Sequence, residues 1–204
     1  MVESRKLAAA FIDRDGVINE ERGYVHRIDD FVMLRGAVEG LRLLQNAGFS
    51  IVVVTNQAGI ARGLYTEDDF ARLTRHMRVL LADSGVKLTA VYHCPHHPDP
   101  GLGAVGQDCE CRKPKPGMLL RAGRELGLDL SGSVLVGDKI GDIEAGRAAG
   151  LALNVLVSSG HPIASGDRAR ADACCADLAD AAAWIVAHSP YHSEPLDLSL
   201  RREK

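Results

Sequence analysis

One stretch near the start of the chain decides its fold: Phe11-Ile12-Asp13-Arg14-Asp15-Gly16-Val17-Ile18-Asn19. It continues an apolar run from Leu7, which predicts a buried strand of a parallel sheet. Side chains two residues apart on a strand face the same way, so Asp13 and Asp15 should converge at its carboxyl end while Arg14 points elsewhere. Gly16 permits a sharp turn directly after them. Two carboxylates this close predict a metal ion or a shared proton, and a solvated acidic turn is the alternative.

Length and composition narrow the class of protein. A chain of 204 residues with 46% hydrophobic content can bury one good core. Its formal net charge of −3 gives no support for a nucleic-acid partner. We find no apolar run long enough to span a bilayer and no signal peptide in the first residues, so we expect a cytoplasmic protein without a membrane partner. Nothing in the sequence suggests an obligate interface, and we expect a monomer.

Strands and helices alternate along the rest of the chain. We expect buried strands over residues 7–12, 50–54, 88–92, 133–136 and 151–155. We expect helices over residues 37–47, 66–85, 118–126, a short one up to 149–150, and one over 177–187. This alternation is typical of a Rossmann-like three-layer α/β/α fold with a central parallel sheet. Residues 1–188 should form a single domain, followed by a polar C-terminal tail over residues 189–204.

Polar side chains follow the predicted strands where they end. Asp13 and Asp15 follow the first strand, Thr55 and Asn56 the second, and Asp138 the fourth. Ligands of open parallel sheets bind beyond the carboxyl ends of the strands, so one site should be built from several strand ends.

These residue types suit phosphoryl transfer, which needs a nucleophile and positive charge around the phosphoryl oxygens. We expect Asp13 to attack phosphorus and Asp15 to act as general acid and then base. Asp13, a backbone carbonyl near Asp15, and Asp138 would hold Mg²⁺, which prefers oxygen ligands. Thr55 and Lys113 would hold the phosphoryl oxygens.

Four segments together resemble the signatures of the haloacid dehalogenase superfamily of aspartate-nucleophile phosphatases. They are Asp13-Arg14-Asp15-Gly16, Thr55-Asn56-Gln57, Arg112-Lys113-Pro114 and Gly137-Asp138-Lys139-Ile140-Gly141-Asp142. Within the superfamily, residues 10–159 look most like the D-glycero-D-manno-heptose-1,7-bisphosphate 7-phosphatase family, notably in Gly23-Tyr24-Val25-His26 and Gly59-Ile60-Ala61-Arg62-Gly63.

The resemblance implies a capless fold and an Mg²⁺-dependent reaction through an aspartyl-phosphate on Asp13. It implies that Arg112 recognises substrate, that Lys113 stabilises the phosphoryl group and that Asp138 binds Mg²⁺. It also implies substrate contacts from Glu21, Arg22, Gly23, Tyr24, Asn56, Gln57 and Lys139. No segment is long enough for an inserted cap domain, so the site should be open to a small sugar phosphate.

A loop of cysteines and histidines over residues 94–111 has its own interpretation. Cys94, His96, Cys109 and Cys111 supply three thiolates and one imidazole, a complete tetrahedral set for structural Zn²⁺. Free cysteines in a mobile loop are the alternative. The resembling family carries the same four-ligand loop. His93 and His97 are expected outside the ligand set, and the Cys174-Cys175 pair is expected to pack in the core.

Several questions stay open from the sequence. Arg62 either reaches a substrate phosphate or lies in a solvated loop. Asp142 either supports the metal or supplies favourable charge at a helix start. Lys115 is expected to be a surface residue. Three functions compete with this one. The chain could be a histidinol-phosphate phosphatase, a phosphatase for some other small sugar phosphate, or a catalytically silent scaffold.

Overall fold

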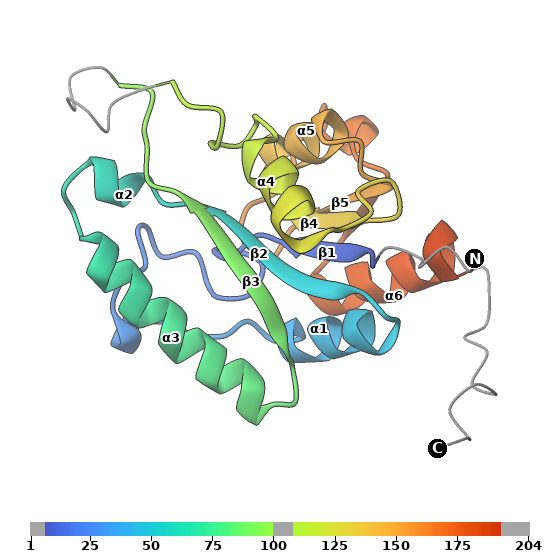
Figure 1. Cartoon of the computed structure of the whole chain (residues 1–204), viewed down its shortest axis with the longest axis horizontal. Coiled ribbons are helices and arrows are strands. Elements are labelled where there is room, and N and C mark those ends of the chain that lie inside the picture. Colours follow the sequence, from blue (N-terminus) through green and yellow to red (C-terminus); the bar gives the residue numbers. More distant parts are fainter. Residues whose placement is uncertain (1–6, 100–107, 193–204) are drawn as a thin grey trace.

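The central sheet contains six parallel strands within the part of the chain that the computed structural model describes, residues 7–99 and 108–192. They are β1 (Ala9–Ile12), β2 (Ser50–Asn56), β3 (Leu88–Cys94), β4 (Val134–Gly137), β5 (Leu153–Val157) and β6 (Ala173–Cys175). Their order is β3-β2-β1-β4-β5-β6 (Figure 1). The predicted α/β class with a parallel sheet is confirmed.

The strand order reverses between β1 and β4. The chain builds outward from β1 to β3, then returns to the other side of β1 and builds outward again from β4 to β6. The Asp13 amide donates to the carbonyl of Val136 at 3.0 Å, which ties the end of β1 to β4. Doubly wound sheets bind their ligands at such a reversal, so the polar residues at the ends of β1 and β4 lie at the expected place.

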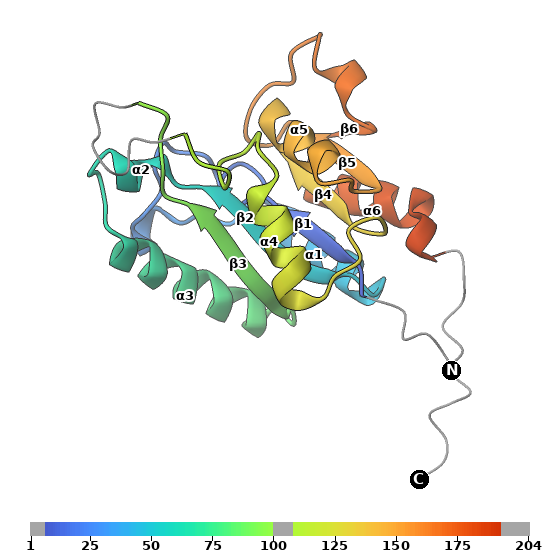
Figure 2. The same cartoon turned by 45° about the horizontal axis from the view of Figure 1, so that its top comes forward.

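Helices cover both faces of the sheet (Figure 2). Helices α1 (Ala37–Asn46), α3 (Glu67–Asp83) and α6 (Leu178–His188) pack on one face, and α4 (Gly117–Leu126) and α5 (Ile140–Ala148) pack on the other. Along β1, Ala10 and Ile12 enter the first core while Ala9 and Phe11 enter the second, as the two-residue period of a strand requires. The predicted three layers are confirmed.

Local signals place the helix ends well. Thr66 and Asp69 form the capping box predicted for the start of α3, and each side chain bonds the other residue's backbone N–H. Gly127 ends α4 in the left-handed conformation at φ 64°, where a glycine is favoured.

Two sheet predictions needed correction. The fifth strand runs from Leu153 to Val157 and not over 151–155, and β6 was not predicted. β6 has only three half-buried residues at the sheet edge, too few for a hydrophobic period. Its Cys174 and Cys175 pack against opposite cores, in agreement with the packing role expected for them.

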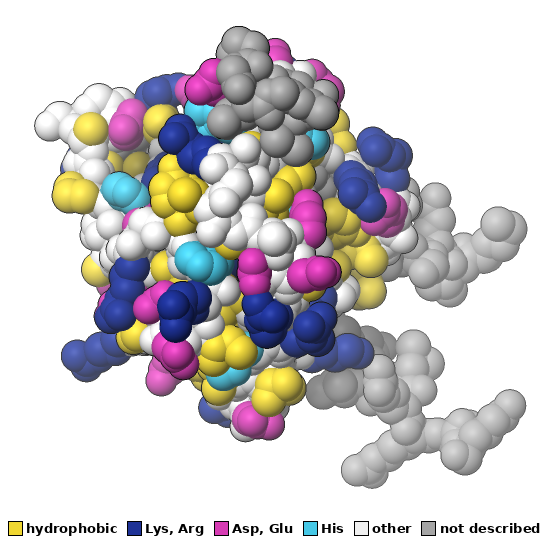
Figure 3. Space-filling view, turned by 90° about the vertical axis from the view of Figure 1, so that its left-hand side faces the viewer, with side chains coloured by type: hydrophobic (Ala, Val, Ile, Leu, Met, Phe, Trp, Pro, Cys, Tyr) yellow, Lys and Arg dark blue, Asp and Glu magenta, His cyan; other side chains and the backbone are white. Residues whose placement is uncertain are grey.

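The connections carry no extra domain in the described parts. Between β1 and α1 there is only one 3-10 turn, Ile28–Asp30, and residues 95–99 and 108–116 contain neither helix nor strand. Short α2 (Ala58–Ala61) follows β2. None of the described helices combines the length and apolar character needed to cross a bilayer. On the face shown in Figure 3, where α2 and α3 lie, positive and negative side chains are interspersed.

Candidate active site

Three buried carboxylates meet where β1 and β4 end. Oxygens of Asp13, Asp138 and Asp142 all lie within 4.8 Å of one another. Gly16 makes this approach possible, because a Cβ at its position would lie 2.3 Å from Asp138 Oδ2. Burial raises the pKa of Asp13 to about 7, and the neighbouring carboxylates Asp142, Asp138 and Asp15 add to the shift while Lys113 opposes it. The cluster therefore needs added positive charge to hold all its carboxylates ionised.

The cluster fits a hard cation. Asp138 Oδ1 is buried and has no hydrogen-bond partner among the described residues, while Asp138 Oδ2 lies 2.6 Å from His161 Nδ1. Burial also raises the pKa of Asp138, so an unpaired charge there is costly. An oxygen-only donor set with a free buried oxygen suits Mg²⁺. Asp142, for which two interpretations were open, belongs to this cluster, whereas the Asp15 carboxylate does not.

Lys113 supplies the positive charge of the cluster. Its ammonium lies 3.0 Å from Asp13 Oδ1 and 2.6 Å from Asp142 Oδ1, and it donates to the Val54 carbonyl at 2.8 Å. Burial alone would lower the pKa of Lys113, but Asp13 and Asp142 outweigh it and hold the pKa above its usual range. Lys115, two residues on, instead pairs with Asp108 and Glu110 at the surface, as expected.

The raised pKa of Asp13 predicts how stability depends on pH in protein free of Mg²⁺. Folded Asp13 keeps its proton up to about pH 7, while an unfolded aspartate loses it near 3.8. The folded state therefore binds more protons within this window, and raising the pH should lower the free energy of unfolding by at most about 1.4 kcal/mol per pH unit.

Urea unfolding between about pH 5 and pH 7 measures this dependence. Asp13→Asn removes the titrating group, so the wild type should lose more stability than that variant as pH rises. Added Mg²⁺ should flatten the wild-type dependence, because it binds the ionised carboxylate. Equal slopes for both proteins would contradict the assignment.

Asp15 lies in a separate hydrogen-bond network beside the cluster. Its carboxylate accepts from Arg14 Nε and Nη2, from Asn19 Nδ2 at 2.9 Å and from Gln57 Nε2 at 3.0 Å. The expectation that Arg14 points away from the aspartates was wrong for its guanidinium, which contacts Asp15 at 2.8 Å. The reason is tertiary: the arginine is fully buried, and Asp15 together with the Val25 carbonyl accepts from its Nε and Nη2, while its Nη1 has no hydrogen-bond partner among the described residues.

A cavity of about 500 Å³ opens over these groups. Most of the site residues proposed from the sequence line it: Asp13, Asp15, Glu21, Gly23, Tyr24, Thr55, Asn56, Gln57, Arg112, Lys113 and Lys139. Arg22 does not line it, because its guanidinium pairs with Glu20 at 2.6 Å on an exposed stretch. Asp138 also lies outside the lining, buried beside His161. The walls of the cavity come from loops after β1, β2, β3 and β4, as expected for this edge of the sheet.

Asn56 and Gln57 do more than face the cavity. The Asn56 amide exchanges two hydrogen bonds with the backbone of Lys113, at 3.0 and 3.1 Å, and so fixes that residue. Gln57 donates to Asp15 and to Thr55 Oγ1 and accepts from Tyr65. Both side chains therefore hold neighbouring site residues in place. Tyr24 adopts a left-handed φ of 58°, which is uncommon outside glycine.

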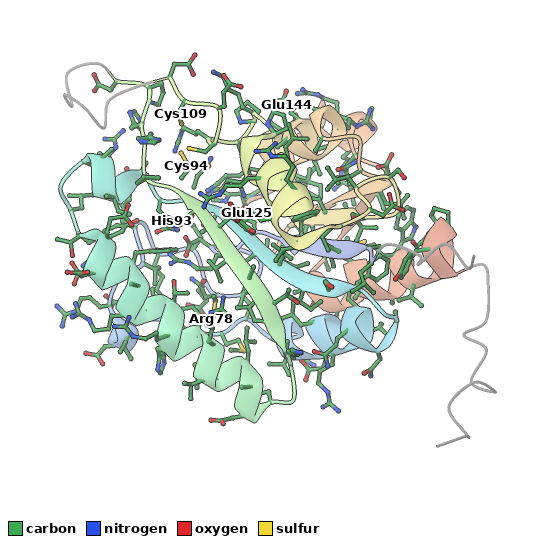
Figure 4. All side chains as sticks on the ribbon, viewed as in Figure 1. Arg78, His93, Cys94, Cys109, Glu125 and Glu144 are labelled. Atoms are coloured by element: carbon green, nitrogen blue, oxygen red, sulfur yellow. The ribbon has the colours of Figure 1, made fainter. Side chains whose placement is uncertain are left out.

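The four predicted zinc ligands meet at the end of β3. Ligand atoms of Cys94, His96, Cys109 and Cys111 lie within 4.8 Å of one another. Cys94 Sγ lies 3.4 Å from Cys109 Sγ and 3.1 Å from Cys111 Sγ, and all three cysteines are free thiols. Cys94 and Cys109 are labelled in Figure 4. Three sulfurs and one imidazole nitrogen converging on one point are the donor set of a structural Zn²⁺ site.

The zinc-ligand cluster is joined to the cavity by Arg112, the residue after its last ligand. Arg112 follows Cys111, and its Nη1 donates to the His96 carbonyl at 3.1 Å. His93 lies outside the cluster against Glu67, at 2.8 Å, as expected. His97 also lies outside it and contacts Arg62 at 2.9 Å at the cavity rim.

Three residues near the chemistry were absent from the site proposed from the sequence, namely Arg14, Tyr65 and His161, and Asp142 was one of its open questions. Asp142 had a usable signal, since it lies four residues after Asp138 at a helix start. Arg14 lies inside the first motif. Tyr65 and His161 reach the site from distant segments, and no local pattern marks them.

Known proteins resemble this chain over most of its length. A family model described as "HAD-hyrolase-like" matches residues 110–181. The D-glycero-beta-D-manno-heptose-1,7-bisphosphate 7-phosphatase of Yersinia pestis is 48% identical over 177 residues, covering 87% of this chain and 94% of that protein. The enzyme of the same name from Escherichia coli K12 is 46% identical, covering 87% and 93%.

Solved structures resemble it as well. The D,D-heptose 1,7-bisphosphate phosphatase of B. bronchiseptica, complexed with magnesium and phosphate, is 32% identical with a TM-score of 0.76, covering 90% of this chain and all of that one. The enzyme of the same name from Burkholderia thailandensis is 26% identical with a TM-score of 0.62, covering 88% and 98%.

Proposed function

The chain belongs to the D-glycero-beta-D-manno-heptose-1,7-bisphosphate 7-phosphatase family of haloacid dehalogenase-like proteins, and from that premise we propose that it removes the 7-phosphate of this β-anomeric bisphosphate. One observation carries the proposal beyond the family name. The carboxylate of Asp13 lies 3.0 Å from the ammonium of Lys113, at the base of a cavity of about 500 Å³. A nucleophile beside a fixed positive charge is what phosphoryl transfer to a side chain needs.

In the first step, an oxygen of Asp13 attacks the phosphorus of the 7-phosphate. The bond between phosphorus and O7 breaks, and Asp15 gives its proton to the departing O7. Lys113 and Thr55 bind the phosphoryl oxygens and stabilise their charge. The product of this step is an aspartyl-phosphate on Asp13.

In the second step, Asp15 takes a proton from a water molecule, which attacks the phosphorus of the aspartyl-phosphate. The acyl phosphate bond breaks, phosphate leaves, and the Asp13 carboxylate is restored. Asp13, Asp138 and the backbone carbonyl of Asp15 would hold Mg²⁺, with Asp142 beside them. The ion, when bound, offsets the repulsion between these carboxylates and the phosphate dianion.

The rest of the substrate would contact the cavity walls. We assign these contacts to Glu21, Gly23, Tyr24, Arg112 and Lys139, with Asn56 and Gln57 beneath them. Arg112 and Lys139 are cationic and suit the 1-phosphate, while Glu21, whose Oε2 lies 3.3 Å from Lys139 Nζ, suits a sugar hydroxyl. Arg22 could contact the substrate only if its ion pair with Glu20 were broken.

Residues 1–188 would act as one capless domain, with the polar residues 189–204 as its tail, of which residues 193–204 lie outside the described part of the chain. We further propose that the protein works as a monomer in the cytoplasm. All the groups assigned to the reaction come from one chain, and a reducing compartment keeps the three cysteine ligands free to bind metal.

Phosphate release tests the function. The purified protein with Mg²⁺ would be offered the β and α anomers of D-glycero-D-manno-heptose 1,7-bisphosphate, with histidinol phosphate alongside. We expect fast release from the β anomer and a clear preference over the amine substrate. Preference for histidinol phosphate would contradict the substrate and retain the chemistry, whereas no release from any of them would favour a silent scaffold.

Zinc removal tests the second metal. Cys109→Ser should lower bound zinc from about one equivalent per chain to near none, because the site needs its four ligands. Turnover should fall about tenfold, since Arg112 and Lys113 directly follow the last ligand. Elemental analysis and a phosphate assay measure both effects.

Cys174→Ser is the matched control, because Cys174 lies on β6 outside the cluster. It should keep its zinc and its activity. Equal zinc content in the two variants would show that Cys109 is not a ligand.

A further inference from the structure

A buried chain of hydrogen bonds leads from Tyr65 to Asp15. The Tyr65 hydroxyl donates to Gln57 Oε1 at 2.5 Å, and Gln57 Nε2 donates to Asp15 Oδ2 at 3.0 Å. The same Nε2 donates to Thr55 Oγ1 at 2.9 Å. Tyr65 and Gln57 are both largely buried, at 6% and 2% exposed, which limits the competition of bulk water for these bonds. The function proposed above uses Asp15 and Thr55 but leaves Tyr65 without a role.

The chain has a direction that the tyrosine sets. Gln57 Oε1 faces two donors, the Tyr65 hydroxyl and Arg14 Nη2, the latter at 3.4 Å. If the amide turned over, its oxygen would face the Asp15 carboxylate, and its NH₂ group would face two donors. Burial raises the pKa of the Tyr65 hydroxyl above its usual value, so it keeps its proton and remains a donor. Tyr65, whose bond to Gln57 Oε1 is much shorter than that of Arg14, is therefore the main donor that fixes which end of the amide reaches Asp15.

The ring of Tyr65 is itself held firmly. It stacks on His26 with ring centroids 4.9 Å apart and planes 7° from parallel. On α2, a Cβ at Gly59 would lie 2.0 Å from Tyr65 Cε1, so only glycine leaves room for the ring. His26 lies in the loop after β1, and Gly59 lies on α2, which follows β2. Tyr65 is thus wedged between His26 and Gly59, and its hydroxyl donates to Gln57.

We propose that Tyr65 is a positioning residue for the reaction, acting through Gln57 to orient the carboxyl group of Asp15 toward the leaving oxygen. The inference rests on the proposed function, in which Asp15 protonates that oxygen.

The consequence depends on the leaving group. A sugar alkoxide is a strong base and needs its proton as the bond to phosphorus breaks, whereas p-nitrophenolate leaves readily without one. A misplaced Asp15 should therefore slow attack on the sugar phosphate much more than attack on p-nitrophenyl phosphate. The ratio kcat/KM reports this first step for both substrates.

The decisive variant is Tyr65→Phe, which removes only the hydroxyl. We expect kcat/KM for the heptose bisphosphate to fall about 10-fold to 100-fold, part of what general acid catalysis contributes, and kcat/KM for p-nitrophenyl phosphate to fall about twofold or less. Tyr92→Phe is the matched control: Tyr92 is also buried, but its hydroxyl donates to Glu125 on α4 (labelled in Figure 4). This control should keep the wild-type ratio of the two substrates.

Gln57→Glu is the second variant, because it keeps the acceptor for Tyr65 and places an oxygen against Asp15. It should show the same substrate-dependent loss, and thermal unfolding of each variant reports whether it is folded. Equal losses on both substrates in the folded variants, or no loss on either, would overturn the inference. Failure of the wild type on the heptose bisphosphate with turnover of p-nitrophenyl phosphate would instead contradict the proposed substrate, and an alkyl phosphate that it does hydrolyse would then test Tyr65.

Discussion

Asp13→Asn should reduce phosphate release by at least about 10³-fold, because the amide oxygen is a poor nucleophile and cannot form the acyl phosphate. The same change removes one of the three clustered carboxylates and weakens the site for Mg²⁺. The fold should survive, since Lys113 keeps its contacts with Asp142 and Val54. Removing a carboxyl group whose pKa burial raises should not cost stability at neutral pH. Steady-state phosphate release and urea unfolding measure the two effects.

Asp29→Asn is the matched control for this change. Asp29 is exposed in the turn after β1, and its carboxylate lies 3.9 Å from the guanidinium of Arg27, so the control should behave like the wild type. Acid quenching during turnover adds a direct readout, because the wild type should carry a phosphoryl group on the peptide that contains Asp13. A rate for Asp13→Asn within about tenfold of the wild type would exclude the covalent mechanism.

Lys113→Met should be the second most damaging substitution. It keeps the length of the side chain but removes the charge that binds Asp13, Asp142 and the Val54 carbonyl. Leaving two buried carboxylates without their partner should cost about 3–5 kcal/mol of stability. Loss of a fixed charge at the phosphoryl oxygens should lower kcat about 10²-fold to 10³-fold. Urea unfolding and kcat at a temperature where the variant is folded separate the two effects.

Lys115→Met is the matched control for Lys113→Met, because it removes a lysine charge only two residues along the chain but outside the carboxylate cluster. Lys115 is paired with Asp108 and Glu110 at the surface, so stability and turnover should hardly change. Adding Asp142→Asn to Lys113→Met should recover stability without recovering turnover, since it removes one unpaired carboxylate but restores no charge. Similar behaviour of the two single lysine variants would contradict the assignment of Lys113.

Local signals were reliable where a few neighbouring residues decide the outcome. The capping box at Thr66 and Asp69 depends on residues three apart, and the structure forms it as predicted. The apolar runs identified β1, β2 and β4 because a strand buried on both faces needs several consecutive hydrophobic residues. The run over residues 88–92 also identified β3, although this strand lies at the sheet edge and is only partly buried. β6 escaped prediction, since its three residues, which pair with β5 at the sheet edge, are too few for a hydrophobic pattern.

Contacts between distant segments followed different rules. Nothing near Arg14 in the sequence indicates that its guanidinium would reach the Val25 carbonyl and Gln57 Oε1. Tyr65 reaches Gln57 only because Gly59 leaves room for its ring. In both cases a buried donor bonds to the acceptor that the packing of the fold places nearest to it. The spacing of residues along the sequence does not predict which acceptor that is.

The sequence by itself determined the class of fold, the edge of the sheet where the site lies and the four residues that converge as the candidate zinc ligands. Parallel strands end at a common edge, so polar residues after successive strands must meet there. Only the tertiary structure decided which of those residues touch: Asp142 with Lys113, Asp15 with Arg14 and Gln57. The physical reason is that a hydrophobic period sets local conformation, while the partner of each buried charge is chosen by the packing of the whole molecule.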